Sequence, residues 1–224
     1  MRFGVIRFPG SCDEVDALHA CARFGEAELL WHGDRDLRGV DAVVVPGGFS
    51  YGDYLRAGAI ARFAPIMDSV VRFAREGGPV LGICNGFQVL CEADLLPGAL
   101  LPNVSLRFVC RQVGVVVERP DTVFTRGCAP GEVLSILSKH GSGRFHAPES
   151  MLDELEANGQ VALRYAPGEN PNGSIRDIAG VLSSEGNVLG LMPHPEHAVD
   201  PLSGSVDGGR IFAALAGARE PVAA

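Results

Sequence analysis

The first hundred residues alternate between short apolar runs and segments whose apolar residues recur at helical spacing. Glycine, proline or charged residues bound each run, a pattern typical of buried strands. Near-continuous apolar strands indicate a parallel sheet covered by helices on both faces. The predicted strands are Phe3–Phe8, Ala27–Trp31, Val40–Val45 and Val80–Ile83. We therefore predict an α/β fold with a doubly wound, mostly parallel sheet and helices on both faces.

Two helices are predicted between these strands. Asp13 is a candidate N-cap of the first, and Pro65 starts or kinks the second, because its fixed φ suits a first helical turn. The buried stripe of the first helix is expected at Val15, Leu18, Ala22 and Phe24, and that of the second at Ile66, Val70, Phe73 and Ala74.

After Pro97-Gly98 the pattern changes to β-like segments joined by turns, which predicts a small antiparallel β excursion around residues 105–140. With no internal repeat or linker, residues 1–224 are expected to form a single domain, of which residues 220–224 are a frayed tail. The predicted strands of this half are Ser105–Arg111, Val113–Glu118, Val133–Leu137, Val161–Tyr165, Ile178–Val181 and Val188–Leu191, with helices at Glu149–Asn158 and Arg210–Leu215.

Charge and cysteine content narrow the class of protein. The chain carries 19 basic and 27 acidic residues, a net charge of -8, so no basic face for nucleic acid or anionic lipid is expected. The six cysteines form no Cys-x-x-Cys pair, and no secretory signal precedes the first strand, which favours a reduced cytoplasmic protein. No apolar run approaches the ~20 residues that span a bilayer.

One cysteine stands at a strand-to-helix junction. Cys84 follows the strand that ends at Ile83, and a helix is expected from Gly86 onward. Gly82 and Gly86 flank it two residues away on either side, the spacing of a nucleophile elbow. A helix N-terminus favours the thiolate form of such a residue. The alternative is a small buried side chain, the usual place of a cysteine, but the paired glycines favour a nucleophile.

A cysteine nucleophile needs a base and a group that orients the base. His194 follows an apolar strand and stands between Pro193 and Pro195, with Glu196 two residues on. The carboxyl ends of parallel strands form the ligand crevice of doubly wound sheets, so His194 and Cys84 are expected at the same place. The alternative is an ordinary loop histidine that two prolines happen to bracket.

These motifs together resemble a class I, triad-type glutamine amidotransferase domain: Gly-x-Cys-x-Gly-x-Gln at 82–88 and Pro-His-Pro-Glu at 193–196. Within that class the chain resembles, along essentially its whole length, the small glutaminase subunits of phosphoribosylformylglycinamidine synthase in purine biosynthesis. The resemblance implies a flavodoxin-like fold and hydrolysis of the side-chain amide of glutamine. The segments that carry the narrower resemblance are 46–60, 84–88, 108–111, 170–174 and 186–196.

The resemblance, together with the chemistry, assigns Cys84 as nucleophile, His194 as acid and base, and Glu196 as the residue that holds His194. The oxyanion needs backbone donors, for which the N–H of Asn85 and an N–H of the turn at Gly48 and Phe49 are the candidates.

The sequence indicates the residues that contact the substrate less clearly than the catalytic residues. Gln88 lies one helical turn after Cys84, so it faces either the same pocket or solvent. The remaining candidates for substrate binding are Ser50, Asn172, Gly173 and Ser174, for which turn geometry or packing is an equally good explanation. His140 and His146 are interpreted as surface residues or partner contacts, and no cluster has the spacing of metal ligands.

The resemblance also implies partners. Ammonia would pass to a large synthetase subunit that uses ATP and Mg²⁺, and a small bridging subunit often completes such assemblies. The chain has no phosphate-binding Gly-x-x-x-x-Gly-Lys loop, so no cofactor is expected in it. Three positions depart from the family pattern: an asparagine is missing before Cys12, Ser142 stands in place of a glutamate, and His197 in place of an arginine.

Three alternatives remain open at this point. A glutaminase of another amidotransferase pathway would share the triad but not the loop Tyr51–Arg56. A cysteine hydrolase of similar fold would have the elbow without the Pro193–Glu196 motif. A catalytically silent regulatory subunit would keep the fold, although the intact triad argues against it.

Overall fold

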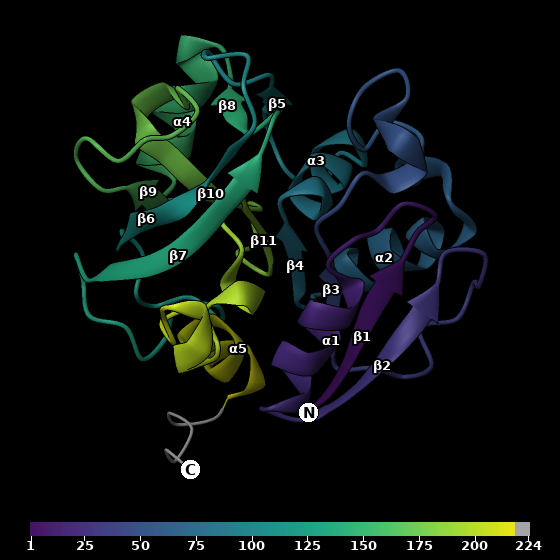
Figure 1. Cartoon of the computed structure of the whole chain (residues 1–224). Helices are drawn as coiled ribbons and strands as arrows, with labels where there is room; N and C mark the ends of the chain where they lie inside the picture. The colour runs from purple at the N-terminus through teal and green to yellow at the C-terminus, as the bar shows by residue number, and fades with distance from the viewer. Residues whose placement is uncertain (218–224) are drawn as a thin grey trace.

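A nine-stranded sheet runs through residues 1–217, the part of the chain that the computed structural model describes (Figure 1). Its strand order is β2-β1-β3-β4-β11-β10-β9-β6-β7. Neighbours in the first half, from β2 to β11, pair in parallel, which confirms the doubly wound sheet. The strands of this half are β1 (Arg2–Arg7), β2 (Glu26–Trp31), β3 (Ala42–Val45), β4 (Val80–Ile83) and β11 (Val188–Leu191).

The other half of the sheet is antiparallel and continues directly from β11. Its strands are β10 (Ile178–Leu182), β9 (Val161–Tyr165), β6 (Val109–Val117) and β7 (Val133–His140); β5 (Ala99–Leu101) and β8 (Arg144–His146) form a separate antiparallel pair. The predicted antiparallel excursion is therefore confirmed, as β6 and β7.

The two strands predicted at 105–111 and 113–118 are a single strand, β6, and residues 105–108 lie outside it. The first residues of β6 extend beyond β9 and pair only with β7, so Cys110 to Gln112 are exposed. This polar, exposed stretch produced the apparent break in the pattern.

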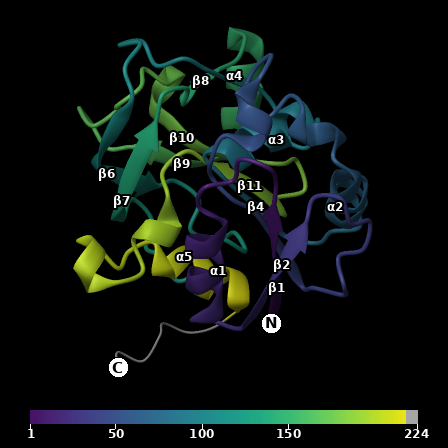
Figure 2. The same ribbon diagram turned by 45° about the vertical axis from the view of Figure 1, so that its right-hand side comes forward.

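Helices cover both faces of the parallel half. They are α1 (Glu14–Ala22), α2 (Pro65–Arg75), α3 (Asn85–Glu92) and α5 (Gly209–Ala216), whereas α4 (Glu149–Ala157) lies beside the antiparallel half (Figure 1). α1 packs against β1, β2 and α5, whereas α3 packs against β3, β4 and β11 (Figure 2). Pro65 is the first residue of α2, as predicted. Within residues 1–217, no helix has the length and apolar character that crossing a membrane would need. The predicted tail, 220–224, lies outside the described residues.

Two expectations for α1 were wrong. Val15 is 45% exposed, and the face turned inward carries Ala17, Ala20 and Cys21 instead. Small residues suit this face because α1 packs against both the sheet and α5. Asp13 precedes the helix but its side chain makes no capping hydrogen bond; the carboxylate is turned toward other partners, described below.

The turn at Cys84 has the backbone of a nucleophile elbow. Cys84 has φ 51° and ψ −102°, in the region that L-residues rarely adopt, between β4 and the first residue of α3. The two glycines are required by close packing. A Cβ on Gly86 would lie 1.8 Å from the carbonyl oxygen of Val45, and one on Gly82 would lie 2.4 Å from Leu90.

We predict that Gly86→Ala lowers the free energy of unfolding by about 1–3 kcal/mol or more, because a methyl group must displace the backbone of β3. Gly209→Ala is the matched control, since it also lies in a first helical turn but its Cβ would meet only ordinary contact, at 3.5 Å from Phe24. Its stability should be unchanged or slightly raised. The measurement is the free energy of unfolding of both variants in urea. An equal loss in the two would mean that the contact with Val45 does not prevent a side chain at position 86.

Candidate active site

The proposed nucleophile and base meet where two adjacent parallel strands end. β4 and β11 pair in register up to Ile83 and Leu191, Cys84 follows the first, and His194 comes shortly after the second. The backbone N–H of Cys84 donates to the carbonyl of Leu191, 2.8 Å away, which ties the two ends together.

Cys84 and His194 line the same cavity, whose volume is about 570 Å³ including solvent at its mouth. The other residues that line it are Cys12, Asp13, Gly48, Phe49, Asp53, Gln88, Phe108, Lys139, His140, Gly141 and Ser142.

His194 is almost completely buried and is oriented by Glu196, as predicted. Its Nδ1 donates to Oε1 of Glu196 across 2.6 Å, and its backbone N–H donates to Leu137 of β7. Among the described residues no hydrogen-bond partner reaches Nε2, so this nitrogen is available to the thiol and to substrate. Burial alone would lower the pKa of His194, but the charges of Glu196 and of the Cys84 thiolate raise it to about 10.

Two of the three predicted oxyanion donors, Asn85 and Gly48, stay predictions that the backbone geometry allows. Asn85 opens α3, so its backbone N–H has no acceptor within the helix. Gly48 lines the cavity with φ +143°, and a Cβ there would collide with the backbone of Cys12. The N–H of Phe49 instead donates to the carbonyl of Gly10 at 2.9 Å. The expectation for Phe49 is therefore wrong, because the loop after β1 already uses this donor.

Gln88 is buried and lines the cavity, which excludes the solvent-facing alternative. Its amide nitrogen donates to the carbonyl of Ser142, and its amide oxygen accepts from the side chain of Asn85. The Asn85 side chain also donates to Asp53 and accepts from the backbone N–H of Ser50. These bonds attach the loop after β3 to the start of α3. Ser50 supports this link but does not line the cavity, so its predicted contact with substrate is not supported.

The structure does not place Asn172, Gly173 and Ser174 in the cavity. Asn172 is fully buried, and its amide donates to His140, Gly143 and Tyr165. The hydroxyl of Ser174 bonds to Asn172. The prediction of direct substrate contact is not supported for this turn, because the side chains of Asn172 and Ser174 are engaged in bonds that support the wall behind the cavity.

His140 is not a surface residue, contrary to expectation. It is 3% exposed and lines the cavity, and burial and the neighbouring His194 lower its pKa to about 4. The even alternation of β7 places His140 on the buried face. That alternation was the available signal, but the predicted strand stopped at Leu137. His146 is exposed, in agreement with the prediction.

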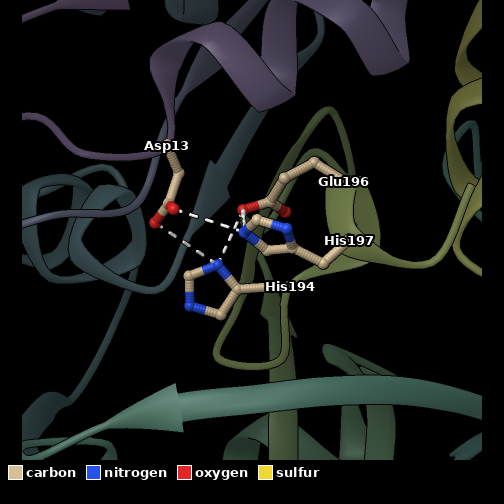
Figure 3. Close-up of side chains that lie close together, drawn as sticks. All are labelled: Asp13, His194, Glu196 and His197. Atoms are coloured by element: carbon tan, nitrogen blue, oxygen red, sulfur yellow. Dashed lines mark hydrogen bonds and ion pairs between the residues drawn. The ribbon is translucent and has the colours of Figure 1, made fainter. Parts of the chain in front are cut away.

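Sequence reasoning also missed the acid–base cluster around Asp13 (Figure 3). Asp13 lies 3.3 Å from Nε2 of His197 and 3.6 Å from Nδ1 of His194, and the ammonium of Lys139 lies 2.5 Å from the same carboxylate. Burial would raise the pKa of Asp13, but the hydrogen bond from His197 and the charges of His194 and Lys139 hold it well below its usual range.

Within the described residues, Asp13, His194, Glu196 and His197 have ligand atoms within 4.8 Å of one another, close enough for a metal ion. Hydrogen bonds account for these atoms equally well, because the Lys139 ammonium already supplies the cation at Asp13. That no metal is needed here stays a prediction.

Comparison with known proteins agrees with this geometry. Residues 1–211 match the model of the CobB/CobQ-like glutamine amidotransferase domain. The chain is 62% identical over 221 residues to phosphoribosylformylglycinamidine synthase subunit PurQ of Rubrobacter xylanophilus, which covers 98% of this chain and 100% of that protein. It is 60% identical over 209 residues to the subunit of the same name in Mycobacterium tuberculosis, with 93% and 92% covered.

Among solved structures, PurLQS from Thermotoga maritima contains a chain that superposes with a TM-score of 0.88 at 42% identity, covering 96% of both chains. Family match, identity and fold thus point the same way. The chain belongs to the glutamine amidotransferase family, within the group of PurQ subunits of phosphoribosylformylglycinamidine synthase.

Proposed function

We propose that this chain is the glutaminase subunit of a phosphoribosylformylglycinamidine synthase. It hydrolyses glutamine to glutamate and ammonia, and a synthetase subunit uses the ammonia and ATP to convert formylglycinamide ribonucleotide to formylglycinamidine ribonucleotide. The observation that carries the proposal is the joining of β4 to β11, which brings the Cys84 elbow and the His194–Glu196 pair to one cavity.

The first half of the reaction forms a thioester. The Cys84 thiolate attacks the side-chain carboxamide carbon of glutamine. His194, held as the imidazolium by Glu196, then donates its Nε2 proton to the departing ammonia. The carbon–nitrogen bond breaks, and the enzyme keeps a glutamyl thioester next to a neutral imidazole.

The second half releases glutamate. Neutral His194 removes a proton from water, and the resulting hydroxide attacks the thioester. The carbon–sulfur bond breaks and restores the thiolate and the imidazolium. Glu196 stays hydrogen-bonded to Nδ1 in both halves, so Nε2 is the nitrogen that exchanges the proton.

Each tetrahedral intermediate carries an oxyanion. We assign two backbone N–H groups to it: that of Asn85, which directly follows Cys84 at the start of α3, and that of Gly48, which lines the cavity. A donor of this kind contributes about 3 kcal/mol to lowering the barrier in comparable sites.

The ammonia must reach the synthetase subunit. Apolar side chains are exposed near the cavity, and we assign them to the contact with that subunit. Phe49 and Phe108 line the cavity and are 51% and 58% exposed; Leu55, two residues after the cavity-lining Asp53, is 85% exposed. Apolar surface of this kind marks a docking site, and burying it would shield the exit from water. A bridging subunit, the use of ATP and Mg²⁺ by the partner, and a cytoplasmic location are parts of the same proposal.

The alternatives are distinguishable by turnover. A glutaminase of another pathway would hydrolyse glutamine but would not be stimulated by the synthetase subunit of purine biosynthesis. A silent regulatory subunit would bind that partner and show no hydrolysis at all.

We predict that Cys84→Ala abolishes glutamine-dependent product formation by the complex with the synthetase subunit but leaves the ammonium-dependent reaction intact, since the nucleophile is needed only to make ammonia. Formation of formylglycinamidine ribonucleotide from each nitrogen source is the measurement. Cys110→Ala, at an exposed cysteine of β6, is the control and should behave as wild type. Residual glutamine-dependent activity in Cys84→Ala would mean that another residue is the nucleophile.

We predict that Glu196→Gln changes the dependence of stability on pH. Because the folded pKa of His194 is raised from 6.5 to about 10, the ion pair stabilises the fold fully below about pH 6.5, and this contribution is lost as pH rises through about 10. The stability advantage of wild type over Glu196→Gln should therefore shrink across this interval. Urea unfolding measures it, with exposed Glu154→Gln as the control. An advantage that stays constant would contradict the assignment.

We predict that Leu55→Asp weakens binding to the synthetase subunit and lowers partner-stimulated glutaminase activity at least about tenfold, because a carboxylate must be desolvated at the interface. Activity of the isolated chain should not change. Leu202→Asp is the matched control. Leu202 is 97% exposed and does not line the cavity, so this substitution adds the same charge at a distant site. Equal binding of both variants in a titration with the partner would exclude the loop at Leu55 from the interface.

A further inference from the structure

Asp13 stands at the position of a helix cap but does not act as one. It directly precedes α1, and an aspartate there normally caps the helix by bonding its first N–H groups. Here the side chain makes no such bond. It is 3% exposed and turns toward the end of β11, 3.6 Å from Nδ1 of His194. The first turn of α1 therefore lacks a side-chain cap, and the Asp13 carboxylate is buried beside the catalytic imidazole instead.

The backbone makes room for this placement. A Cβ on Gly47 would lie 2.4 Å from Oδ2 of Asp13 and 2.7 Å from Cε1 of His194, so only glycine lets the two side chains approach here. The carbonyl of Gly47 also accepts the backbone N–H groups of Cys12 and Asp13, each at 3.3 Å. The loops after β1 and β3 are therefore locked together at the point where Asp13 meets His194.

Two further side chains hold the carboxylate. Oδ1 of Asp13 lies 2.5 Å from Nζ of Lys139 and 3.3 Å from Nε2 of His197. Lys139 is the only lysine of the chain and lines the cavity on β7. Its ammonium compensates the charge of Asp13, and His197 fixes the other side. Oδ2 is left to face His194 (Figure 3).

We propose that Asp13 is a positioning residue of the catalytic centre: its carboxylate is a second anionic partner of the His194 imidazolium beside Glu196, and Lys139 sets how strongly that carboxylate acts. This inference rests on the proposed function, because it assumes that His194 transfers the proton. Asp13 does not take that proton; it stabilises the form of His194 that protonates ammonia.

The charges around His194 determine in which direction its pKa should change in each variant. Removing the anion at Asp13 disfavours the imidazolium, so the pKa of His194 should fall. Removing the cation at Lys139 leaves Asp13 uncompensated next to His194, so the same pKa should rise. Opposite shifts in the two variants would show that both charges act on the His194 imidazole, and the effect on turnover then separates a positioning role from a structural one. Other titratable groups that face this cluster are Cys12, Cys21, Asp53, Cys84, His140, Glu196 and His197, and both variants leave them in place.

The test is a pH titration of the His194 ring by NMR in the whole chain labelled with carbon-13 at histidine Cε1, with the resonance assigned by its loss in His194→Gln. Asp13→Asn should lower the pKa by about one unit, and Lys139→Met should raise it. Asp121→Asn, which removes a carboxylate from an exposed pair with Arg119, is the matched control and should not shift it. Asparagine keeps the shape of the side chain but leaves the Lys139 ammonium without its paired charge, so Asp13→Asn should fold with a lower unfolding midpoint than wild type.

Shifts of the same sign in the two variants, or none in either with the fold intact, would overturn the proposal. If Asp13→Asn did not fold, Lys139→Met alone would decide by the sign of its shift. In the complex with the synthetase subunit, turnover of Asp13→Asn should fall about tenfold with little change in KM, because an imidazolium that has lost one partner is held less firmly in the position from which it protonates ammonia. Full activity of Cys84→Ala would refute the proposed function itself, whereas loss of activity there with no shift in Asp13→Asn would refute this inference alone.

Discussion

The strained turn at Cys84 is the constraint on which the rest of the site depends. A cysteine with φ 51° can exist only if its surroundings hold it there, and the surroundings are close backbone contacts rather than side chains. Gly86 lies against the carbonyl of Val45, and Gly82 lies against Leu90 and the backbone of Gly86. Because of this close packing, β3, β4 and α3 cannot move independently. The thiol is consequently held at the edge of the sheet, facing the cavity.

Around this rigid thiol the chain assembles charges from three separate segments. Asp13 comes from the loop after β1, Lys139 from β7, and His194 and Glu196 from the loop after β11. Each is largely buried, and a buried charge is tolerated only when it is paired. The ion pairs therefore specify where the segments sit relative to one another as well as the ionisation of the imidazole. This dual role explains why Asp13 serves His194 instead of capping α1.

The antiparallel half of the sheet builds the opposite wall of the cavity. β7 supplies Lys139 and His140 and pairs through Leu137 with the backbone of His194. The turn at Asn172 supports His140 from behind with hydrogen bonds that are all internal. Residues that a motif marks as important can thus act through a neighbour, and in this turn the side-chain amide of Asn172 is fully used before any substrate arrives.

The sequence by itself determined the parallel strands, the elbow and the catalytic pair, because these depend on local patterns: apolar runs, two spaced glycines, and a histidine between prolines. Gly82, Cys84, Gly86, His194 and Glu196 could all be found in this way. The positions of Asp13, Lys139 and His140, and the use of the Phe49 N–H by Gly10, were decided only by the tertiary structure. Their partners are distant in the chain, and strand order and the loop packing at Gly47 determine which charge meets which. Local spacing carries no information about such contacts.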